Sequence, residues 1–333
     1  MRFDQLKQQP IDDWLKSIVG SEKQRRRLIV CVSGYESRAS YWAERVLPTV
    51  KPNSECACRV FGFTDRKNDG SRPKNDQFFA DAGFKPVEFP SDEECDIGAT
   101  LTNDIAIMQK SAPRSEVEVH IDYSSMPRRW YCSLFRAAHK QLRKRDSLFM
   151  WYSGGIYDGE EFPTAGVSDI SLFCGQPTIT PKVRTHIFGL GFDRIRASAI
   201  FRVLDPQNLV CFYGEPGVRH EYVKRVREDN RDILAAARYE FSVPVSNFPE
   251  AFSKIADITR DFARIGDVIL VPDGPKPLVL ASSLVPLFFG QRGIVSLHVR
   301  RRKDQESPGL DIRASGSIYG FSVSGSNDEN TDR

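Results

Sequence analysis

Short apolar runs bounded by turn residues alternate with amphipathic, helix-like segments along most of the chain. In the first half, segments over 37–46 and 130–141 have the helical pattern, and 67–75 is hydrophilic and expected to be a loop. The strands expected there are 28–32, 59–63, 117–121 and 148–152. Alternation of this kind is typical of βαβ units around a mainly parallel sheet.

The second half repeats this plan. Helices are expected to end at Leu204 and at Phe289, and two more are expected over 219–237 and 249–265. The strands expected in this half are 186–188, 209–213, 267–271 and 294–299. Each half therefore predicts its own α/β unit.

Short sequence matches relate the two halves. Gly34-Tyr35-Glu36 falls opposite Gly191-Phe192-Asp193, and the same ungapped register continues through the helix that follows. Near the far end of each half, Pro127-Arg128 falls opposite Pro275-Lys276, each after an expected strand and before an apolar helix. Because the matches keep their order and their strand-to-helix context, we predict an α/β fold of two tandem Rossmann-like units with mainly parallel sheets, produced by internal duplication.

Composition shifts suggest where these units begin and end. The segment 153–182 is rich in Gly, Pro and Thr, and the last residues are rich in Ser, Gly, Asp and Asn, although 317–323 has the pattern of one edge strand. The expected divisions are an N-terminal helical extension (1–26), a first unit (27–152), a connector (153–182), a second unit (183–302) and a mobile tail (303–333).

Composition and charge exclude several classes of protein. The chain of 333 residues is 40% hydrophobic and 27% charged, and no stretch approaches the eighteen or so consecutive apolar residues of a membrane span. Seven irregularly spaced cysteines argue against a disulfide framework, so we expect a cytoplasmic protein. The histidines and cysteines form no ligand motif, and neither a metal nor a cofactor is expected. A net charge of +3 is too small to indicate non-specific nucleic-acid binding, and the basic clusters at 23–27, 140–145 and 300–303 adjoin expected strand or helix ends.

The loops after the first strand of each half are candidates for ligand contact. In a parallel α/β sheet, ligands bind beyond the carboxyl ends of the strands, where helix N-termini favour negative charge. The candidate residues are Gly34, Tyr35, Glu36 and Ser37 in the first half and Gly189, Gly191, Asp193 and Arg194 in the second. The glycines of the second set are only a fragment of the dinucleotide fingerprint G-x-G-x-x-G, and there is no Walker A motif. The alternative is a tight turn that needs glycine.

The loops before the later helices carry the sharper signal. Hydroxyls, a helix-starting proline and guanidiniums at a strand exit suit an anionic ligand. The candidates are Ser124, Ser125, Arg128 and Arg129 in the first half and Asp273, Gly274 and Lys276 in the second. The alternative is that the loops only begin helices, with a serine cap and basic side chains in solvent.

The loops after the second strand of each half supply the last candidate residues. Thr64, Asp65, Gly214 and Glu215 are expected to contact a ribose or a base. No catalytic residue is identified, because no base is visible for either serine. Glu36 and Asp193 are expected either to form an acid–base couple or to cap helices and bind hydroxyls.

On these loops the chain resembles the CRISPR-associated Rossmann fold proteins, and it is similar to the SAVED domains, which resemble two such units fused in one chain. The resemblance covers residues 27–300. It implies a pocket for cyclic oligonucleotides or dinucleotides lined by 33–37, 189–194, 124–129 and 273–276. The first half departs from the pattern, because Ser-Met-Pro-Arg-Arg stands where a glycine-rich turn ending in lysine would be expected.

The expected function is therefore nucleotide-ligand sensing in prokaryotic antiviral defence, with a cyclic or linear oligonucleotide bound between the two lobes. A separate effector protein is a further expected partner, and the chain is expected to form a homo-oligomer. Binding to a membrane is not expected. The alternatives are a nucleotide-processing enzyme, such as a ring-opening phosphodiesterase or hydrolase, and a structural subunit of a defence complex.

Overall fold

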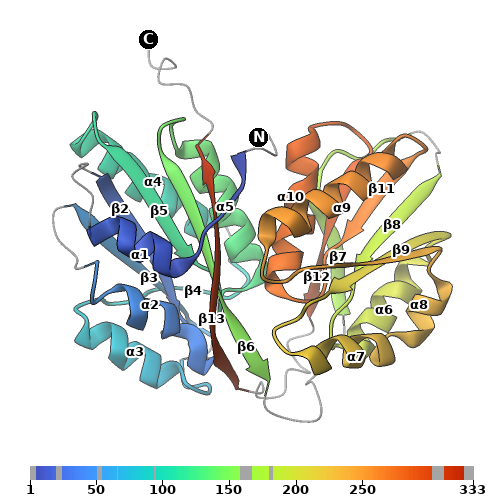
Figure 1. Cartoon of the computed structure of the whole chain (residues 1–333), viewed down its shortest axis with the longest axis horizontal. Coiled ribbons are helices and arrows are strands. Elements are labelled where there is room, and N and C mark those ends of the chain that lie inside the picture. The colour runs from blue at the N-terminus through green and yellow to red at the C-terminus, as the bar shows by residue number, and fades with distance from the viewer. Residues whose placement is uncertain are drawn as a thin grey trace. The chain divides into compact units, whose positions relative to one another are not determined.

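A computed structural model describes residues 5–19, 25–50, 55–65, 67–93, 95–157, 167–179, 183–301 and 311–325. The chain divides into two compact units, and each contains one sheet with helices on it (Figure 1). The first unit is formed by Arg2–Asp158 together with Asp311–Arg333, and the second by Gly159–Leu310. The predicted α/β class with two Rossmann-like units is confirmed.

The sheet of the first unit is parallel over five neighbouring strands and antiparallel at one side. Its order is β1 (Lys7–Gln8), β13 (Ile312–Ser324), β6 (Ser147–Tyr157), β5 (Glu116–Asp122), β2 (Arg25–Ser33), β3 (Cys56–Phe63) and β4 (Val87–Phe89). The strands from β6 to β4 are parallel, whereas β13 runs antiparallel to β6 and β1 antiparallel to β13. The strands β2 and β5 are buried for most of their length, because a parallel sheet is covered on both of its faces.

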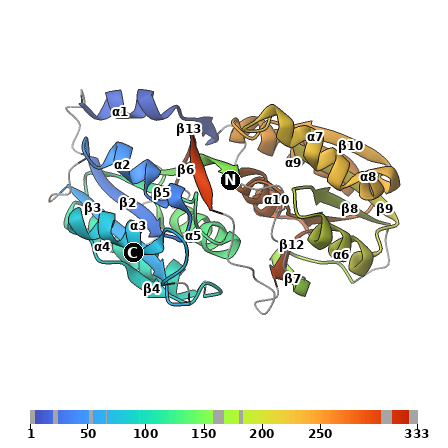
Figure 2. The same ribbon diagram turned by 90° about the horizontal axis from the view of Figure 1, so that it is seen from below.

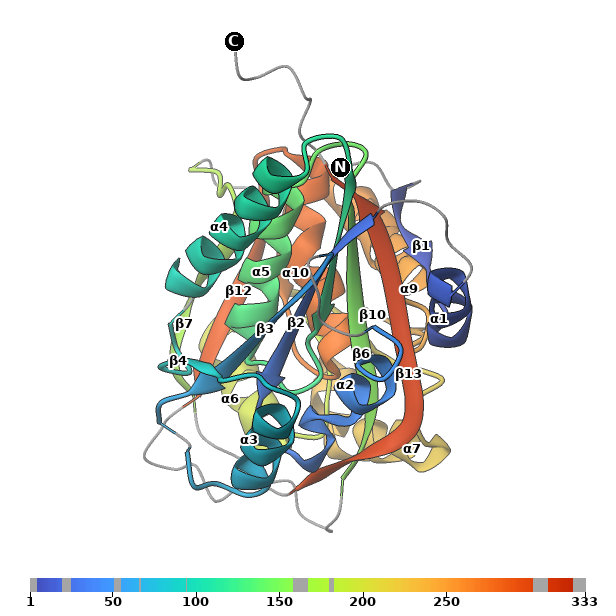
Figure 3. The same ribbon diagram turned by 90° about the vertical axis from the view of Figure 1, so that its left-hand side faces the viewer.

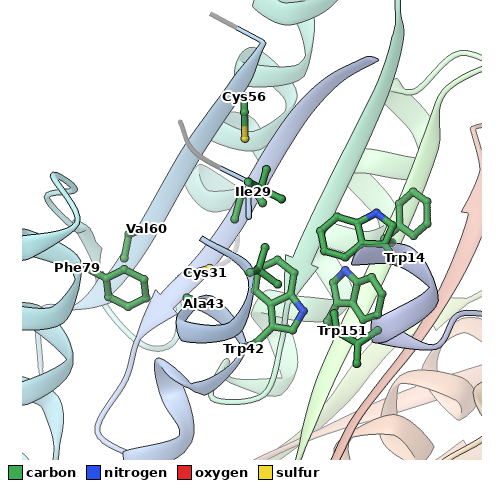
Figure 4. Close-up of a cluster of buried hydrophobic side chains, with 13 residues drawn as sticks. Trp14, Ile29, Cys31, Trp42, Ala43, Cys56, Val60, Phe79 and Trp151 are labelled. Carbon is green, nitrogen blue, oxygen red and sulfur yellow. The ribbon is translucent and has the colours of Figure 1, made fainter. Parts of the chain in front are cut away.

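Helices cover both faces of this sheet (Figure 2). They are α1 (Ile11–Val19), the 3₁₀ turn η2 (Ser37–Ala39), α2 (Tyr41–Val46), α3 (Arg72–Asp81), α4 (Cys95–Ser111) and α5 (Arg128–Gln141). Helices α1, α2 and α3 contribute to one buried cluster with the sheet, in which Trp14, Trp42 and Trp151 pack together (Figure 4). The ring centroid of Trp151 lies 5.2 Å from that of Trp14 and 6.1 Å from that of Trp42. Trp14 therefore anchors α1 to the sheet.

The second unit has the same central topology. Its sheet order is β10 (Tyr239–Val243), β9 (Asn208–Gly214), β8 (Arg184–Gly189), β11 (Asp267–Val271), β12 (Ile294–Arg301) and β7 (Val167–Gly175), and only β7 is antiparallel. Its helices are α6 (Arg194–Leu204), α7 (His220–Asp229), α8 (Arg231–Ala236), α9 (Phe248–Ala263) and α10 (Lys276–Phe289). One core cluster joins the sheet to α6, α7 and α8 through residues such as Ile200, Val226 and Ile233.

Several segments differ from the sequence-based expectations. The segment 67–75, expected to be a loop, contains the start of α3, because Arg72 and Asn75 are buried by polar contacts that hydrophobic patterning cannot detect. Strand β7 lies within the expected connector, and β13 lies within the expected mobile tail, where Tyr319 and its neighbours pair with β6. The possible strand over 317–323 forms part of β13, but β1 covers its outer side, so it is not an edge.

Other elements had no counterpart in the expectations or are divided. Strands β4 and β10 and helix α4 were not anticipated, and the helix expected over 219–237 is two helices separated at Asn230. The rest of the expected tail, 302–310 and 326–333, lies outside the described residues. Among the described residues, every helix is too short or too polar to span a bilayer.

Candidate functional site

Both sheets have a topological switch point at their centre. In the first unit the chain runs from β2 outward to β3 and β4, then crosses back to β5 on the other side of β2. In the second unit it runs from β8 to β9 and β10, then crosses back to β11. Ligands of open α/β sheets bind beyond the carboxyl ends of the two strands at this reversal. The loops that follow β2 and β5, and those that follow β8 and β11, are the loops that the sequence singled out as candidates.

In the first unit, Glu36 joins the two switch-point loops. Its Oε2 accepts hydrogen bonds from Arg38 Nε at 2.7 Å and from Ser125 Oγ at 3.1 Å. Glu36 is 4% exposed and Arg38 is 1% exposed. Burial alone would lower the pKa of Arg38, but the Glu36 carboxylate raises it above its ordinary value. The loop after β2 thus contains a buried ion pair, and the hydrogen bond from Ser125 to Glu36 ties this loop to the loop after β5.

Arg38 also reaches the next strand of the sheet. Its Nη1 donates to the carbonyl oxygen of Ser153 on β6 at 2.9 Å, and its guanidinium lies 5.3 Å from the ring centroid of Tyr152. Glu36 and Arg38 therefore connect three neighbouring segments of one unit.

Ser124 is fully buried beside Asp122. Its backbone N–H donates to Asp122 Oδ1 at 3.0 Å, and its hydroxyl also donates to that oxygen. The same hydroxyl accepts a hydrogen bond from Ser153 N at 2.7 Å. These bonds shape the turn before α5, and Ser125 is the more accessible of the two serines, at 5% exposed.

The loop after β2 is held on two further sides. Asn75 Nδ2, on α3, donates to the carbonyl oxygens of Gly34 at 2.8 Å and Glu36 at 3.0 Å. Ser37 N donates to Asp311 Oδ1 at 2.8 Å, which links the loop to the residue before β13. A Cβ on Gly34 would lie 3.0 Å from Ser125 Cβ, so the two switch-point loops are in close contact.

Arg128 and Arg129 begin α5 directly after Pro127, whose backbone is extended (φ −60°, ψ 152°). Both arginines are half-buried, and the following Trp130 and Tyr131 are fully buried. Arginines in the first turn of a helix run against the macrodipole, which favours anions at this end. The macrodipole therefore does not stabilise these two positive charges at the start of α5.

In the second unit the two switch-point loops touch through their backbones. A Cβ on Gly191 would lie 2.7 Å from Gly274 Cα, and one on Gly189 would lie 2.7 Å from the Asp273 carbonyl oxygen. Gly274 has φ +90°, a conformation that glycine adopts without strain. The alternative of a turn that needs glycine therefore holds in part, because the packing of the two loops requires these residues.

Asp193 and Asp273 both contact a buried arginine, Arg196. Asp193 caps α6 by accepting a hydrogen bond from Arg196 N at 3.1 Å. Arg196 is 1% exposed, and its Nη1 lies 3.7 Å from Asp273 Oδ1. Its Nη2 donates to the carbonyl oxygen of Val299 on β12 at 3.5 Å. Arg196 therefore does in the second unit what Arg38 does in the first.

Lys276 is the first residue of α10, after Pro275, and it is half-buried. Arg194 begins α6 and is exposed, and Tyr35 is half-buried with its ring centroid 6.3 Å from that of Phe63. Both helices thus open at the switch point with a basic residue.

The loops after β3 and β9 make their contacts toward β4 and β10, the outermost strands on that side of each sheet. Thr64 and Asp65 are exposed, and Asp65 Oδ2 accepts a hydrogen bond from Ser91 Oγ at 2.6 Å. Glu215 is also exposed, and its backbone N–H donates to the carbonyl oxygen of Val243 on β10 at 2.8 Å. A Cβ on Gly214 would lie 2.5 Å from the side chain of Val245, which follows the same strand. Both exits are therefore held by segments that belong to or follow β4 and β10, beyond the switch-point strands.

Four residues of this arrangement were missed by the sequence analysis: Arg38, Asn75, Arg196 and Asn230. Asn230 Nδ2 donates to the carbonyl oxygen of Gly191 at 2.9 Å, as Asn75 does to Gly34. The arginines lie next to helix starts that were identified, so a basic residue within the first turn was an available signal. The asparagines come from other elements, and nothing in the local sequence marks them.

The two carboxylates of the switch-point loops are engaged within the protein. Glu36 accepts hydrogen bonds from Ser125 and Arg38, and Asp193 caps α6. Capping a helix and binding hydroxyl groups was one of the two roles expected for these carboxylates, and an acid–base couple was the other. Within the described parts of the chain, no group of three His, Cys, Asp or Glu side chains lies close enough to hold a metal ion.

Comparison with known proteins shows a likeness in fold. No protein-family model matches the chain, and no curated protein matches it either. Among solved structures it is similar to one described as "Structure of a Type III CRISPR defence DNA nuclease activated by cyclic oligoadenylate", with 8% sequence identity and a TM-score of 0.51. The match covers 83% of this chain and 66% of that chain, so this chain spans slightly under two thirds of the nuclease. At this identity the likeness shows a shared fold.

Proposed function

We propose that this protein senses a nucleotide ligand, a cyclic or linear oligonucleotide, in prokaryotic antiviral defence. The observation that carries the proposal is a repeated one: in each unit, a helix with a basic first residue begins at the switch point of the sheet. These helices are α5, beginning at Arg128, and α10, beginning at Lys276. The fold likeness to a defence nuclease that is activated by cyclic oligoadenylate supports the choice of ligand class.

Phosphate is the ligand chemistry that these helix starts favour. The first N–H groups of a helix have no partner within the helix, and the macrodipole adds positive potential there. Arg128 offers a planar fork for phosphate oxygens, and Lys276 offers a compact charge. Arg129, Ser125 and Gly274 complete the expected contacts, while Gly34, Tyr35, Gly191 and Arg194 shape the crevices.

The buried networks supply rigidity rather than ligand contacts. Glu36, Arg38 and Ser124 use their polar atoms within the protein. Preorganised loops lose little entropy on binding, which increases affinity without further contacts. We expect a sensor of this kind to signal through a separate effector protein or through a homo-oligomer.

A thermal-shift screen against linear and cyclic di-, tri- and tetranucleotides tests the proposal. A ligand of the folded state adds about 2.7 kcal/mol of stability at a hundredfold excess over its dissociation constant, so the melting temperature of the protein should rise clearly. The recovered ligand is then analysed by chromatography. A stabilising oligonucleotide recovered intact supports the sensor, and no shift with any of them contradicts it.

One contact favours a second candidate, an enzyme that processes nucleotides. Ser125 Oγ donates to Glu36 Oε2, which is the arrangement of a hydroxyl nucleophile and a carboxylate base. However, Arg38 occupies the same carboxylate oxygen, which competes with that role. Breakdown of a bound cyclic oligonucleotide that is abolished by Ser125→Ala would establish the enzyme instead.

A further inference from the structure

The amino-terminal edge of the first unit's sheet, opposite the switch point, gathers basic side chains from two separate loops. Helices α4 and α5 run side by side and both end at this edge (Figure 3). Gln109 Nε2, near the end of α4, donates to the carbonyl oxygen of Gln141, the last residue of α5, at 3.4 Å. This contact joins the ends of the two helices, which carry Lys110 and Lys140, although these segments are far apart in sequence.

A buried carboxylate fixes the loops that follow these helices. Asp146 is fully buried and accepts hydrogen bonds from Gln109 Nε2 at 2.9 Å, Val117 N at 2.9 Å and Arg143 Nε at 2.8 Å. Arg143 also donates to the carbonyl oxygens of Pro113 at 3.0 Å and Ser115 at 3.0 Å. The loops 112–116 and 142–146 are therefore joined into one rigid edge.

The side chains displayed on this edge are mostly cationic. Lys110, Arg114, Lys140 and Lys144 are exposed, and Arg145, half-buried, donates to the carbonyl oxygen of Pro113. The carboxylates of the edge are already engaged by arginines, since Asp146 pairs with Arg143 and Glu116 pairs with Arg25. We call Lys110, Arg114, Lys140, Lys144 and Arg145 the basic edge.

We propose that the basic edge binds the phosphate backbone of double-stranded nucleic acid without reading its sequence. Several cations displayed on one rigid backbone framework suit a row of phosphates, because the loops that carry them need no ordering on binding. The segments 109–116 and 139–146 contain no Phe, Tyr or Trp. Proteins that hold single strands use such side chains to stack bases, so the duplex is the better fit.

This surface is separate from the proposed ligand site, which lies at the opposite ends of the same strands. The small net charge of the whole chain, +3, had argued against such binding. The tertiary structure changes that argument, because affinity for a duplex depends on how many cations face it together rather than on the net charge.

The test compares two variants that carry the same change of charge in different places. Variant one is Lys110→Glu, Arg114→Glu and Lys140→Glu, all on the basic edge. The matched control is Lys16→Glu, Lys74→Glu and Lys85→Glu, which replaces three exposed lysines elsewhere on the same unit. Both shift the net charge equally, and all six side chains are exposed, so both variants should fold; circular dichroism and thermal melting verify this.

Binding of a fluorescein-labelled DNA duplex of mixed sequence is measured by fluorescence anisotropy over a series of salt concentrations. We expect wild type to bind at low salt, variant one to bind at least tenfold more weakly, and the control to keep most of the affinity. The slope of log K against log salt is negative, and each lost phosphate contact makes it less steep by roughly 0.9. The slope of variant one should therefore be less steep than that of wild type by roughly 2 to 3.

Four results would overturn the proposal. They are no binding of the duplex by wild type at low salt, equal weakening in both triple variants, tighter binding of a labelled single strand than of the duplex, and binding of phosphatidylserine vesicles without binding of the duplex.

Discussion

The side-chain amide of Asn75 is held against the backbone of Gly34, with 2.8 Å between Nδ2 and the carbonyl oxygen. The second unit repeats the relationship, with 2.9 Å between Asn230 Nδ2 and the carbonyl oxygen of Gly191. The glycines correspond in sequence, but the asparagines do not: Asn75 lies within α3, and Asn230 lies between α7 and α8. Each unit thus fixes its first switch-point loop by the same bond from a different place.

Replacing Asn75 by Ala should destabilise the first unit. The substitution removes the donor to two buried carbonyl oxygens, those of Gly34 and Glu36, which costs about 1–3 kcal/mol. Urea unfolding followed by far-UV circular dichroism measures the change. The control Asn103→Ala removes an exposed amide from α4 and should stay within about 0.5 kcal/mol of wild type. Equal effects in the two variants would contradict the structural role of Asn75.

Gly274→Ala should destabilise the protein more than Gly83→Ala, although the two glycines have nearly the same φ, +90° and +86°. A left-handed alanine costs about 1–2 kcal/mol at either position. At Gly274 the added Cβ would also lie 2.6 Å from the carbonyl oxygen of Leu190, whereas at Gly83 it meets nothing within 4 Å. Unfolding free energies measure the difference, which disappears if the two switch-point loops do not touch.

The buried pair of Glu36 and Arg38 should show strong energetic coupling. Arg38→Met alone leaves a buried carboxylate without its cation, and such a loss costs about 3–5 kcal/mol. Adding Glu36→Gln should recover part of this loss, so the double variant should be destabilised by less than the sum of the single effects. The same cycle on the exposed pair Lys224 and Glu228 should give a coupling near zero. Simple additivity at Glu36 and Arg38 would refute the coupling.

Burial lowers the pKa of His139 to about 4 from its ordinary value of 6.5. Below pH 6.5 the unfolded chain takes up a proton that the folded protein does not accept until about pH 4. The contribution of His139 to stability is therefore complete above pH 6.5 and decreases as the pH falls toward 4. His139→Gln should flatten the decrease by up to about 1.4 kcal/mol per pH unit, measured as unfolding free energy. A variant with the slope of wild type would contradict this.

Arg128→Ala and Lys276→Ala should each weaken binding of the oligonucleotide found in the thermal-shift screen. The loss of one charged contact corresponds to about 1.5–3 kcal/mol, measured by isothermal titration calorimetry. The controls Lys74→Ala and Lys224→Ala remove exposed lysines, one from each unit, and should leave the affinity unchanged. Unchanged affinity in both test variants would remove these residues from the site.

The sequence identified all four strands that meet at the switch points, and with them the loops at their ends. Strands β2 and β11 were expected because their apolar runs are continuous, as burial on both faces requires. Strand β5 was expected because apolar and polar residues alternate over 117–121, and β8 was expected from the short run 186–188. Helix α3 was missed for the opposite reason. Its stability depends on Arg72 and Asn75, whose partners are carboxylates and carbonyl groups, so its sequence resembles a hydrophilic loop.

What the sequence determined by itself is local: the alternation of strands and helices, the repeat that pairs Gly34 with Gly191, and the helix starts at Arg128 and Lys276. These follow from side-chain periodicity and turn chemistry, which act over a few residues. Only the tertiary structure decided that β13 joins the first sheet and that Arg38 and Arg196 are buried. Both depend on pairing between distant segments, because a buried charge or an added strand is stable only where the rest of the fold supplies its partners.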